Sequence, residues 1–146
     1  MTRPNVPSTP GLYIVTLKNK QRISVNRNDR RIAHLCITVN PENCKFGHAK
    51  DLARRYRDYC SVFRERNVVF HPIATLLNPR AIERAVLDEL RPYRKSGRAR
   101  RLTEWLEDGF PARQVADLAA KVLAEHAPQH VRLPGMNLLL CLARPG

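Results

Sequence analysis

The sequence has no apolar run long enough to cross a bilayer. Its longest run covers residues 138–143, whereas a membrane-spanning helix needs roughly 20 apolar residues. Residues 1–10 also lack the apolar stretch that a secretory signal requires. We therefore expect a cytoplasmic protein with no membrane partner.

Paired cysteines are missing as well. The cysteines form no CxxC motif, so we expect reduced thiols rather than disulfides. The alternative is a zinc site, but the spacing of its candidate ligands fits no usual zinc finger. Those ligands would be Cys36, Cys44, His48 and Cys60.

Acidic residues are scarce: 13 Asp and Glu stand against 26 Lys and Arg, for a formal net charge of +13. Such an excess favours a polyanionic partner, usually nucleic acid and less often an anionic membrane or an acidic protein. Segments 18–31 and 91–101 carry six Lys or Arg each. Together they predict surfaces that follow phosphates without reading sequence. Their candidate DNA-binding residues are Lys18, Arg22, Arg94, Lys95, Arg98, Arg100 and Arg101.

Strand and helix patterns are mixed along the chain, which predicts an α+β fold with a small antiparallel sheet flanked by helices. We expect a disordered leader over 1–10, a main domain over 11–110, and a C-terminal helix and apolar tail, packed on it, over 111–146. The expected strands are 11–17, 23–25, 32–39, 44–49, 68–75 and 137–143. The expected helices are 51–65, 79–91, a short one through Leu102, Trp105 and Leu106, and 111–126.

The helix expected over 51–65 carries an arginine at the rim of its apolar face. That face holds Tyr59, and Arg55 lies one turn before it on the same side. An arginine that extends its charged end to solvent beside a packed tyrosine explains this pattern without any function. The other residues of the face are Leu52, Tyr56, Cys60 and Phe63.

The helix expected over 79–91 has a carboxylate inside its apolar arc. Glu83 lies among Ile82, Val86, Leu87 and Leu90. A buried carboxylate is unfavourable unless a charge or a metal pairs with it. Two interpretations remain open here: a structural salt bridge, for instance with Arg55, or a metal-binding carboxylate that reaches a cleft.

The stretch KFGHAKDLARRYRDY at 45–59, with IERAV at 82–86 and EWL at 104–106, resembles the GIY-YIG nuclease superfamily. Its leading lysine resembles the phage-type KIG branch, and its helix motif resembles the bacterial excision-repair incision subunit. The resemblance covers about residues 11–107. It implies a small antiparallel sheet flanked by helices, and an endonuclease that uses Mg²⁺, or Mn²⁺, to hydrolyse phosphodiester bonds of DNA.

The resemblance also implies catalytic roles for individual residues. Arg55 would lie near the scissile phosphate, and Glu83 would hold the single metal ion. Tyr59 would be a supporting tyrosine on the helix. Lys45 stands where that superfamily usually has a tyrosine, and His48 lies three residues further on.

The first motif of the superfamily is matched by GLY at 11–13, which makes Tyr13 the general base or the tyrosine that positions the nucleophile. Tyr13 and Lys45 are far apart in the sequence, however, so this match requires an insertion over 18–40. The alternative is a hairpin over 33–47, with His34 in place of the tyrosine. We favour Tyr13.

Two other functions remain open. A catalytically inactive nucleic-acid-binding domain on the same scaffold would explain the departures from the motifs. The apolar tail MNLLLCLA at 136–143 could instead pair with a second copy by strand addition, which would give a homodimer.

Overall fold

The computed structural model describes residues 5–126, except for 25, 27 and 97–101. Its centre is a five-stranded antiparallel sheet, which confirms the expected α+β class. In spatial order the strands are β5 (Val68–Thr75), β1 (Gly11–Leu17), β4 (Cys44–Ala49), β7 (Leu102–Leu106) and β6 (Arg94–Ser96).

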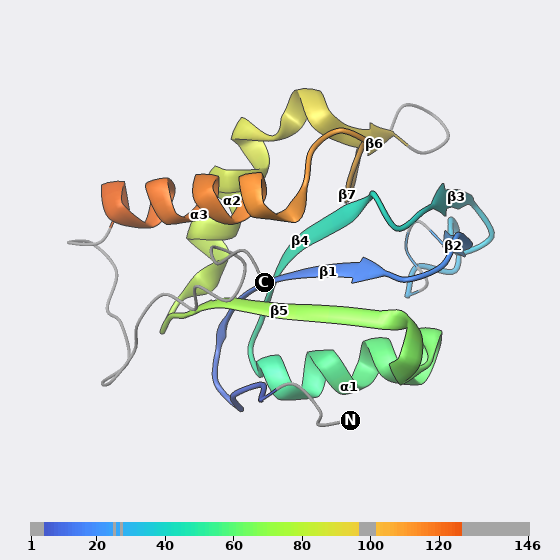
Figure 1. The fold of residues 1–146 in the computed structure, drawn as a ribbon, viewed down its shortest axis with the longest axis horizontal. Helices are drawn as coiled ribbons and strands as arrows, with labels where there is room; N and C mark the ends of the chain where they lie inside the picture. Colours follow the sequence, from blue (N-terminus) through green and yellow to red (C-terminus); the bar gives the residue numbers. More distant parts are fainter. Residues whose placement is uncertain (1–4, 25, 27, 97–101, 127–146) are drawn as a thin grey trace.

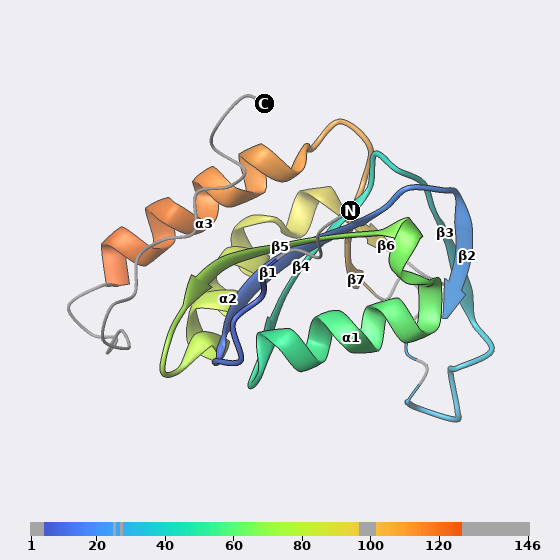
Figure 2. The same ribbon diagram turned by 60° about the horizontal axis from the view of Figure 1, so that its bottom comes forward.

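Helices cover both faces of this sheet (Figures 1 and 2). The α1 helix (Leu52–Phe63) lies on one face, and α2 (Pro79–Glu89) and α3 (Ala112–His126) lie on the other. Two short 3₁₀ turns, η1 (Glu65–Asn67) and η2 (Arg91–Tyr93), follow α1 and α2. Within the described residues, no helix combines the length and the apolar character that crossing a bilayer would require.

Alternation along β1 divides the core into two layers. Leu12 and Ile14 point to the α2 and α3 side, where they join an apolar cluster. Tyr13, Val15 and Leu17 point to the α1 side, where a second cluster forms. Because α3 contributes to the first cluster, the C-terminal helix is part of the same core as the sheet.

The start of α1 is fixed by several contacts. The side chain of Asp51 accepts a hydrogen bond from the Arg54 backbone N–H at the N-cap. The segment expected to be a disordered leader contributes too. Within it, the carbonyl oxygens of Pro7 and Thr9 accept from the backbone N–H groups of Ala53 and Leu52. Residues 5–10 therefore satisfy donors that a helix start leaves free.

Residues 18–40 form an insertion between β1 and β4. These two strands pair directly with each other, and Tyr13 lies opposite Gly47. The insertion builds a separate two-stranded sheet from β2 (Gln21–Ser24) and β3 (Cys36–Val39). A hairpin over 33–47 is therefore wrong, because β3 pairs with β2 and not with β4.

Some expected elements need correction. The short helix expected through Leu102, Trp105 and Leu106 is strand β7, because it pairs with β6 on one side and, at Trp105, with Lys45 of β4 on the other. The strand expected over 32–39 starts only at Cys36, since residues 32–35 form a turn. The strand expected over 137–143 and the apolar tail lie outside the described residues.

We expect Gly11→Ala to destabilise the fold. A Cβ atom at this position would overlap the carbonyl oxygen of Ala74 and crowd a methyl group of Leu52. Because the clash involves backbone of the neighbouring strand β5, it cannot be relieved by a side-chain rotation. The free energy of unfolding in urea should fall by about 1–3 kcal/mol. An unchanged free energy would show that β1 and β5 are not packed as described.

Candidate functional site

Four side chains on the α1 face of the sheet form what we call the tyrosine–cation cluster: Tyr13, Lys45, Arg55 and Tyr59. Strand β1 supplies Tyr13, β4 supplies Lys45, and α1 supplies the other two. The Tyr13 side chain crosses the backbone of Gly47. A Cβ atom on Gly47 would lie 2.5 Å from the Tyr13 hydroxyl oxygen, so only glycine leaves room for the ring there.

Hydrogen bonds join the two tyrosines to the arginine. The Tyr13 and Tyr59 hydroxyl oxygens are 2.8 Å apart, and Nη1 of Arg55 donates to the Tyr13 hydroxyl over 3.2 Å. The Phe70 ring stacks on the Tyr13 ring with centroids 4.8 Å apart. These contacts hold the guanidinium of Arg55 at the rim of the face, as its position on the helix predicted.

Lys45 is the second cation of the cluster. Its Nζ lies 5.4 Å from the centroid of the Tyr59 ring and 3.4 Å from Oε2 of Glu104. Sequence reasoning noticed Glu104 only as part of the EWL motif and gave it no role. The sequence did not indicate that Glu104 lies near Lys45, because 102–106 was expected to be a helix. The segment forms β7 instead, which runs beside Lys45.

The protonation states follow from burial and charge. Burial raises the pKa of the Tyr13 phenol, and Lys45 and Arg55 only partly oppose this. Tyr13 therefore stays protonated at neutral pH, which favours a positioning role over that of a general base. Burial lowers the pKa of the Lys45 ammonium, but Tyr59, Tyr13 and Glu104 more than offset this, and the net direction is upward. At neutral pH the ion pair with Glu104 favours the charged form of Lys45.

The other two expected catalytic residues form a separate His48–Glu83 pair. Nδ1 of His48 lies 2.9 Å from Oε1 of Glu83. The contact is close but poorly aligned, and this buried nitrogen has no hydrogen-bond partner of good geometry among the described residues. Glu83 therefore has a basic partner in His48, and the structural salt bridge with Arg55 that the sequence left open is not formed.

The cluster and the pair lie on opposite faces of the sheet. His48 is the strand partner of Leu12, which points to the α2 and α3 side, whereas Gly47 is the partner of Tyr13. We also expected the Tyr13 hydroxyl to lie near Arg55 and Glu83; it bonds Arg55, but Glu83 lies on the other face. Both groups nevertheless flank the same stretch of β4.

That stretch of β4 pairs with a neighbouring strand on one side only, in the described residues. In the described residues, β4 pairs with β7 only at Lys45 and Trp105. The segment from Phe46 to Ala49 is therefore bonded to β1 on one side and not to β7 on the other.

The donor set limits the metals that the protein can hold. No group of three or more His, Cys, Asp or Glu suited to a metal ion occurs in the described part of the chain. The zinc site considered from the cysteines and His48 is therefore not formed. Glu83, whose side chain is 12% exposed, remains a single carboxylate of the kind that suffices for Mg²⁺, because this ion keeps most of its water ligands.

The expected DNA-binding residues fall into three groups. Lys18 and Arg22 are exposed. Arg94 donates to the carbonyl oxygen of Thr103 over 2.8 Å, and Nζ of Lys95 lies 3.9 Å from Oε2 of Glu107, so both are engaged within the protein. The last three, Arg98, Arg100 and Arg101, lie outside the described residues.

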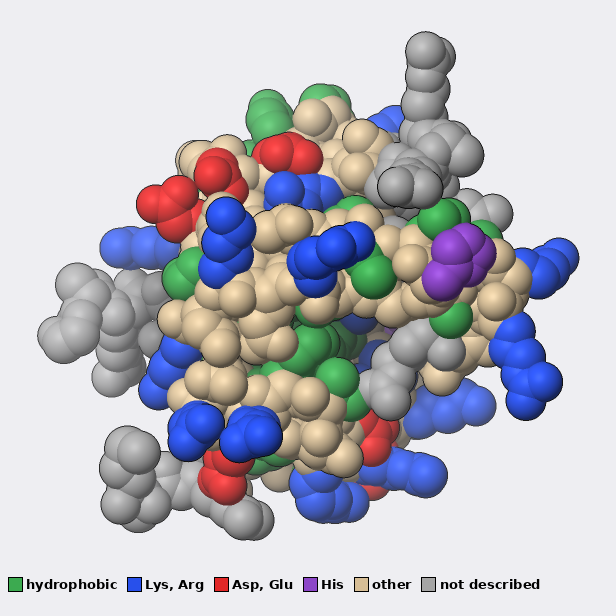
Figure 3. All heavy atoms as spheres, turned by 90° about the vertical axis from the view of Figure 1, so that its right-hand side faces the viewer, with side chains coloured by type: hydrophobic (Ala, Val, Ile, Leu, Met, Phe, Trp, Pro, Cys, Tyr) green, Lys and Arg blue, Asp and Glu red, His purple; other side chains and the backbone are tan. Residues whose placement is uncertain are grey.

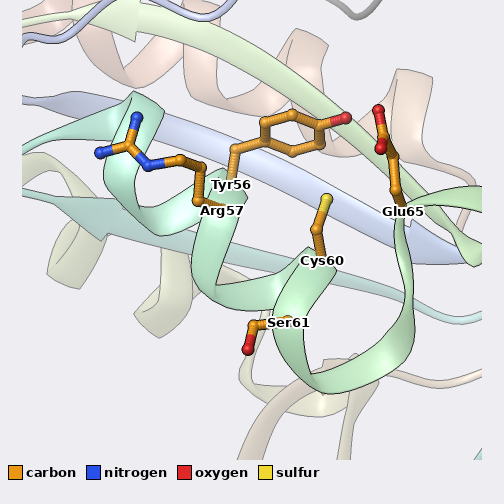
Figure 4. A pocket seen from close by; sticks show the side chains of 5 residues that line it. All are labelled: Tyr56, Arg57, Cys60, Ser61 and Glu65. Carbon is orange, nitrogen blue, oxygen red and sulfur yellow. The ribbon is translucent and has the colours of Figure 1, made fainter.

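A shallow pocket of about 320 Å³ lies on the outer side of α1 (Figure 4). In it the Tyr56 ring points toward Glu65, and Arg57 points away. None of the residues that line this pocket belongs to the tyrosine–cation cluster or the His48–Glu83 pair. The pocket is lined by Tyr56, Arg57, Cys60, Ser61 and Glu65.

A comparison with protein families finds one matching model, described as the T5orf172 domain, over residues 32–123. No curated protein and no solved structure matches the chain. The family expected from the motifs is thereby corrected: the matching model is that of a distinct family and not a GIY-YIG model. The match is compatible with a nucleic-acid-related function. It contains every residue of the cluster and the pair except Tyr13.

We expect the two tyrosine hydroxyls to be energetically coupled. Tyr13→Phe and Tyr59→Phe should each lower the free energy of unfolding by about 0.5–1.5 kcal/mol, because each removes one partner of a buried hydrogen bond. A double-mutant cycle in urea should return a coupling of about 0.5–3 kcal/mol. Tyr93→Phe is the control, since Tyr93 is 47% exposed and packs on Phe110; with Tyr13→Phe it should be additive. Additivity of the first pair would contradict the hydrogen bond.

Proposed function

We take as our premise that this chain belongs to the T5orf172 domain family, whose model matches more than half of its length, and we propose that it is a metal-dependent endonuclease. It hydrolyses phosphodiester bonds of DNA, with the scissile phosphate contacted by Lys45 and Arg55. The observation that carries this proposal is the convergence of two cations on one hydrogen-bonded pair of tyrosines: Arg55 donates to the Tyr13 hydroxyl, and the Lys45 ammonium lies over the Tyr59 ring.

This arrangement suits a phosphoryl group. Arginine offers paired N–H donors to phosphate oxygens, and an ammonium adds a point charge. Because Arg55 donates one N–H to Tyr13, its guanidinium is oriented before the substrate binds. Preorganised donors of this kind stabilise the charge that develops on a phosphoryl oxygen. In this proposal Arg55 and Lys45 contact the substrate, and the fully buried Tyr13 positions Arg55.

The metal ion would be Mg²⁺ or Mn²⁺, held by Glu83 on the other side of the β4 edge. When bound, such an ion would supply an activated water and would neutralise negative charge on the phosphate. His48, whose buried Nδ1 lies 2.9 Å from Oε1 of Glu83, would help to position this carboxylate. The remaining ligands would be water and phosphate oxygens, as is usual for Mg²⁺.

A second candidate function is nucleic-acid binding without cleavage. It is favoured by the burial of Tyr13, which is 0% exposed and therefore does not reach a substrate directly. Under this alternative the cations of the cluster bind a phosphate and no bond is broken. The two functions predict opposite results in a plasmid-nicking assay: an endonuclease nicks the plasmid, and a binding domain does not.

We expect the purified chain to nick supercoiled plasmid in Mg²⁺ or Mn²⁺ and not in EDTA. Arg55→Ala should lower the nicking rate by about 100-fold or more, because a preorganised donor is lost. Glu83→Gln should abolish nicking while binding of a labelled duplex is retained, since the side chain keeps its shape and loses its charge. Glu89→Gln, an exposed position on the same helix, is the matched control and should nick as the wild type does.

The outcomes separate the candidates. A wild-type protein that binds DNA and never nicks it, with either metal, would establish the binding-only function. Full activity of Glu83→Gln would show that Glu83 does not hold the metal ion. Loss of activity in Glu104→Gln, with Glu83→Gln active, would place the essential carboxylate beside Lys45 instead.

A further inference from the structure

We infer that the β2–β3 ribbon, by which we mean residues 18–40, is the element that binds duplex DNA, and that it enters the major groove through the outer face of β2. The inference rests on the proposed function, because it names the form of nucleic acid that this site takes. It goes beyond the charge of the segment, because it depends on how the ribbon is built and anchored.

The ribbon is not needed to complete the main sheet. It leaves the sheet where Thr16 of β1 pairs with Cys44 of β4, so a short turn could join these strands. It forms its own two-stranded sheet beside the five-stranded one. An isolated pair of strands is at best marginally stable in water, so the ribbon needs an anchor.

The anchor is the inner face of the ribbon. Ile23 is directly opposite Ile37, and they are 8% and 9% exposed, while Val39 is fully buried. All three belong to the same apolar cluster as Tyr13 and Tyr59. The ribbon is therefore fixed to the layer of the protein that carries the tyrosine–cation cluster.

The outer face of the ribbon is exposed and cationic. Arg22 lies opposite Thr38, and both are exposed. Lys18 and Lys20 are exposed in the bend that leads from β1 into β2, and they add two cations next to Arg22. Asp29 is the one acidic residue in segment 18–40 of the sequence, and its carboxylate binds Arg31.

Figure 3 looks onto the side of the molecule that carries the ribbon. Lys and Arg side chains are spread across this side, and the surface is hollowed near its centre, where hydrophobic side chains show. The α3 helix lies on the other side of the molecule in Figure 1. The positive charge of the ribbon is thus placed beside the proposed site and away from α3.

The shape of the ribbon selects double-stranded DNA. The major groove of B-DNA is about 12 Å wide and admits a two-stranded ribbon, whereas the deep, narrow major groove of A-form RNA does not admit side chains. Binding of single strands usually depends on aromatic side chains that stack on bases. Segment 18–40 contains no Phe, Tyr or Trp. Cationic side chains that follow phosphates are what this face offers instead.

The test compares two double variants of the full chain that lose the same charge. Lys20→Ala with Arg22→Ala removes cations from the ribbon. Arg113→Ala with Lys121→Ala removes exposed cations from α3. Binding to a labelled 20-base-pair DNA duplex is measured by fluorescence anisotropy over a salt series, alongside the single strand and the RNA duplex of the same sequence. All four substituted side chains are exposed, so both variants should melt at the wild-type temperature.

We expect the ribbon variant to lose about tenfold or more in affinity for duplex DNA, and its slope of log K against log salt to become shallower by about two units. The α3 variant should keep the wild-type slope. The wild type should prefer the DNA duplex over the single strand and the RNA duplex, and the ribbon variant should lose that preference. Equal losses in both variants, or equal losses on all three nucleic acids, would overturn the inference.

The result is separable from the proposed function. If the ribbon variant loses duplex binding while the wild type nicks no plasmid with either metal, the ribbon binds duplex DNA and the nuclease proposal fails. If the wild type nicks plasmid and the ribbon variant binds and nicks as the wild type does, the nuclease proposal stands and the ribbon inference fails.

Discussion

The site depends on one close approach, that of the Tyr13 ring to the bare backbone of Gly47. It lets the Tyr13 hydroxyl cross the neighbouring strand and reach both Tyr59 and Arg55 on α1. One side chain thereby links β1, β4 and α1, and it offers the guanidinium of Arg55 a buried hydrogen-bond acceptor. A hydroxyl held in this way orients a charge without being exposed to a substrate itself.

The two halves of the site lie on opposite faces of one sheet. Arg55 and Lys45 lie on the α1 face, and His48 and Glu83 lie on the face that α2 covers. A single layer of strand separates them, and β4 has an unpaired edge beyond Lys45. In the proposed function both groups contact one substrate, beside the point where the pairing of β4 with β7 stops at Trp105.

The insertion adds a surface without disturbing this centre. Because β1 and β4 pair through their whole contact, the segment between them is free to form its own sheet. Ile23, Ile37 and Val39 join the core, and Lys18, Lys20 and Arg22 remain exposed to solvent. The ribbon thus buries one face and exposes the other, as an amphipathic strand does. Its exposed face places cations beside the proposed site.

Local signals in the sequence determined the helices, most of the strands and the surface charge. The apolar spacing of Leu52, Tyr56 and Tyr59 predicts α1, and Asn78 with Pro79 predicts the start of α2, although the Asn78 side chain makes no capping bond. Tertiary structure alone decided that 102–106 is a strand, because its partners lie far away in the chain. It also decided that Glu83 meets His48 rather than Arg55. Helical periodicity shows which residues share a face of one helix, but the face of the sheet that a helix covers is set by long-range packing, which no local pattern records.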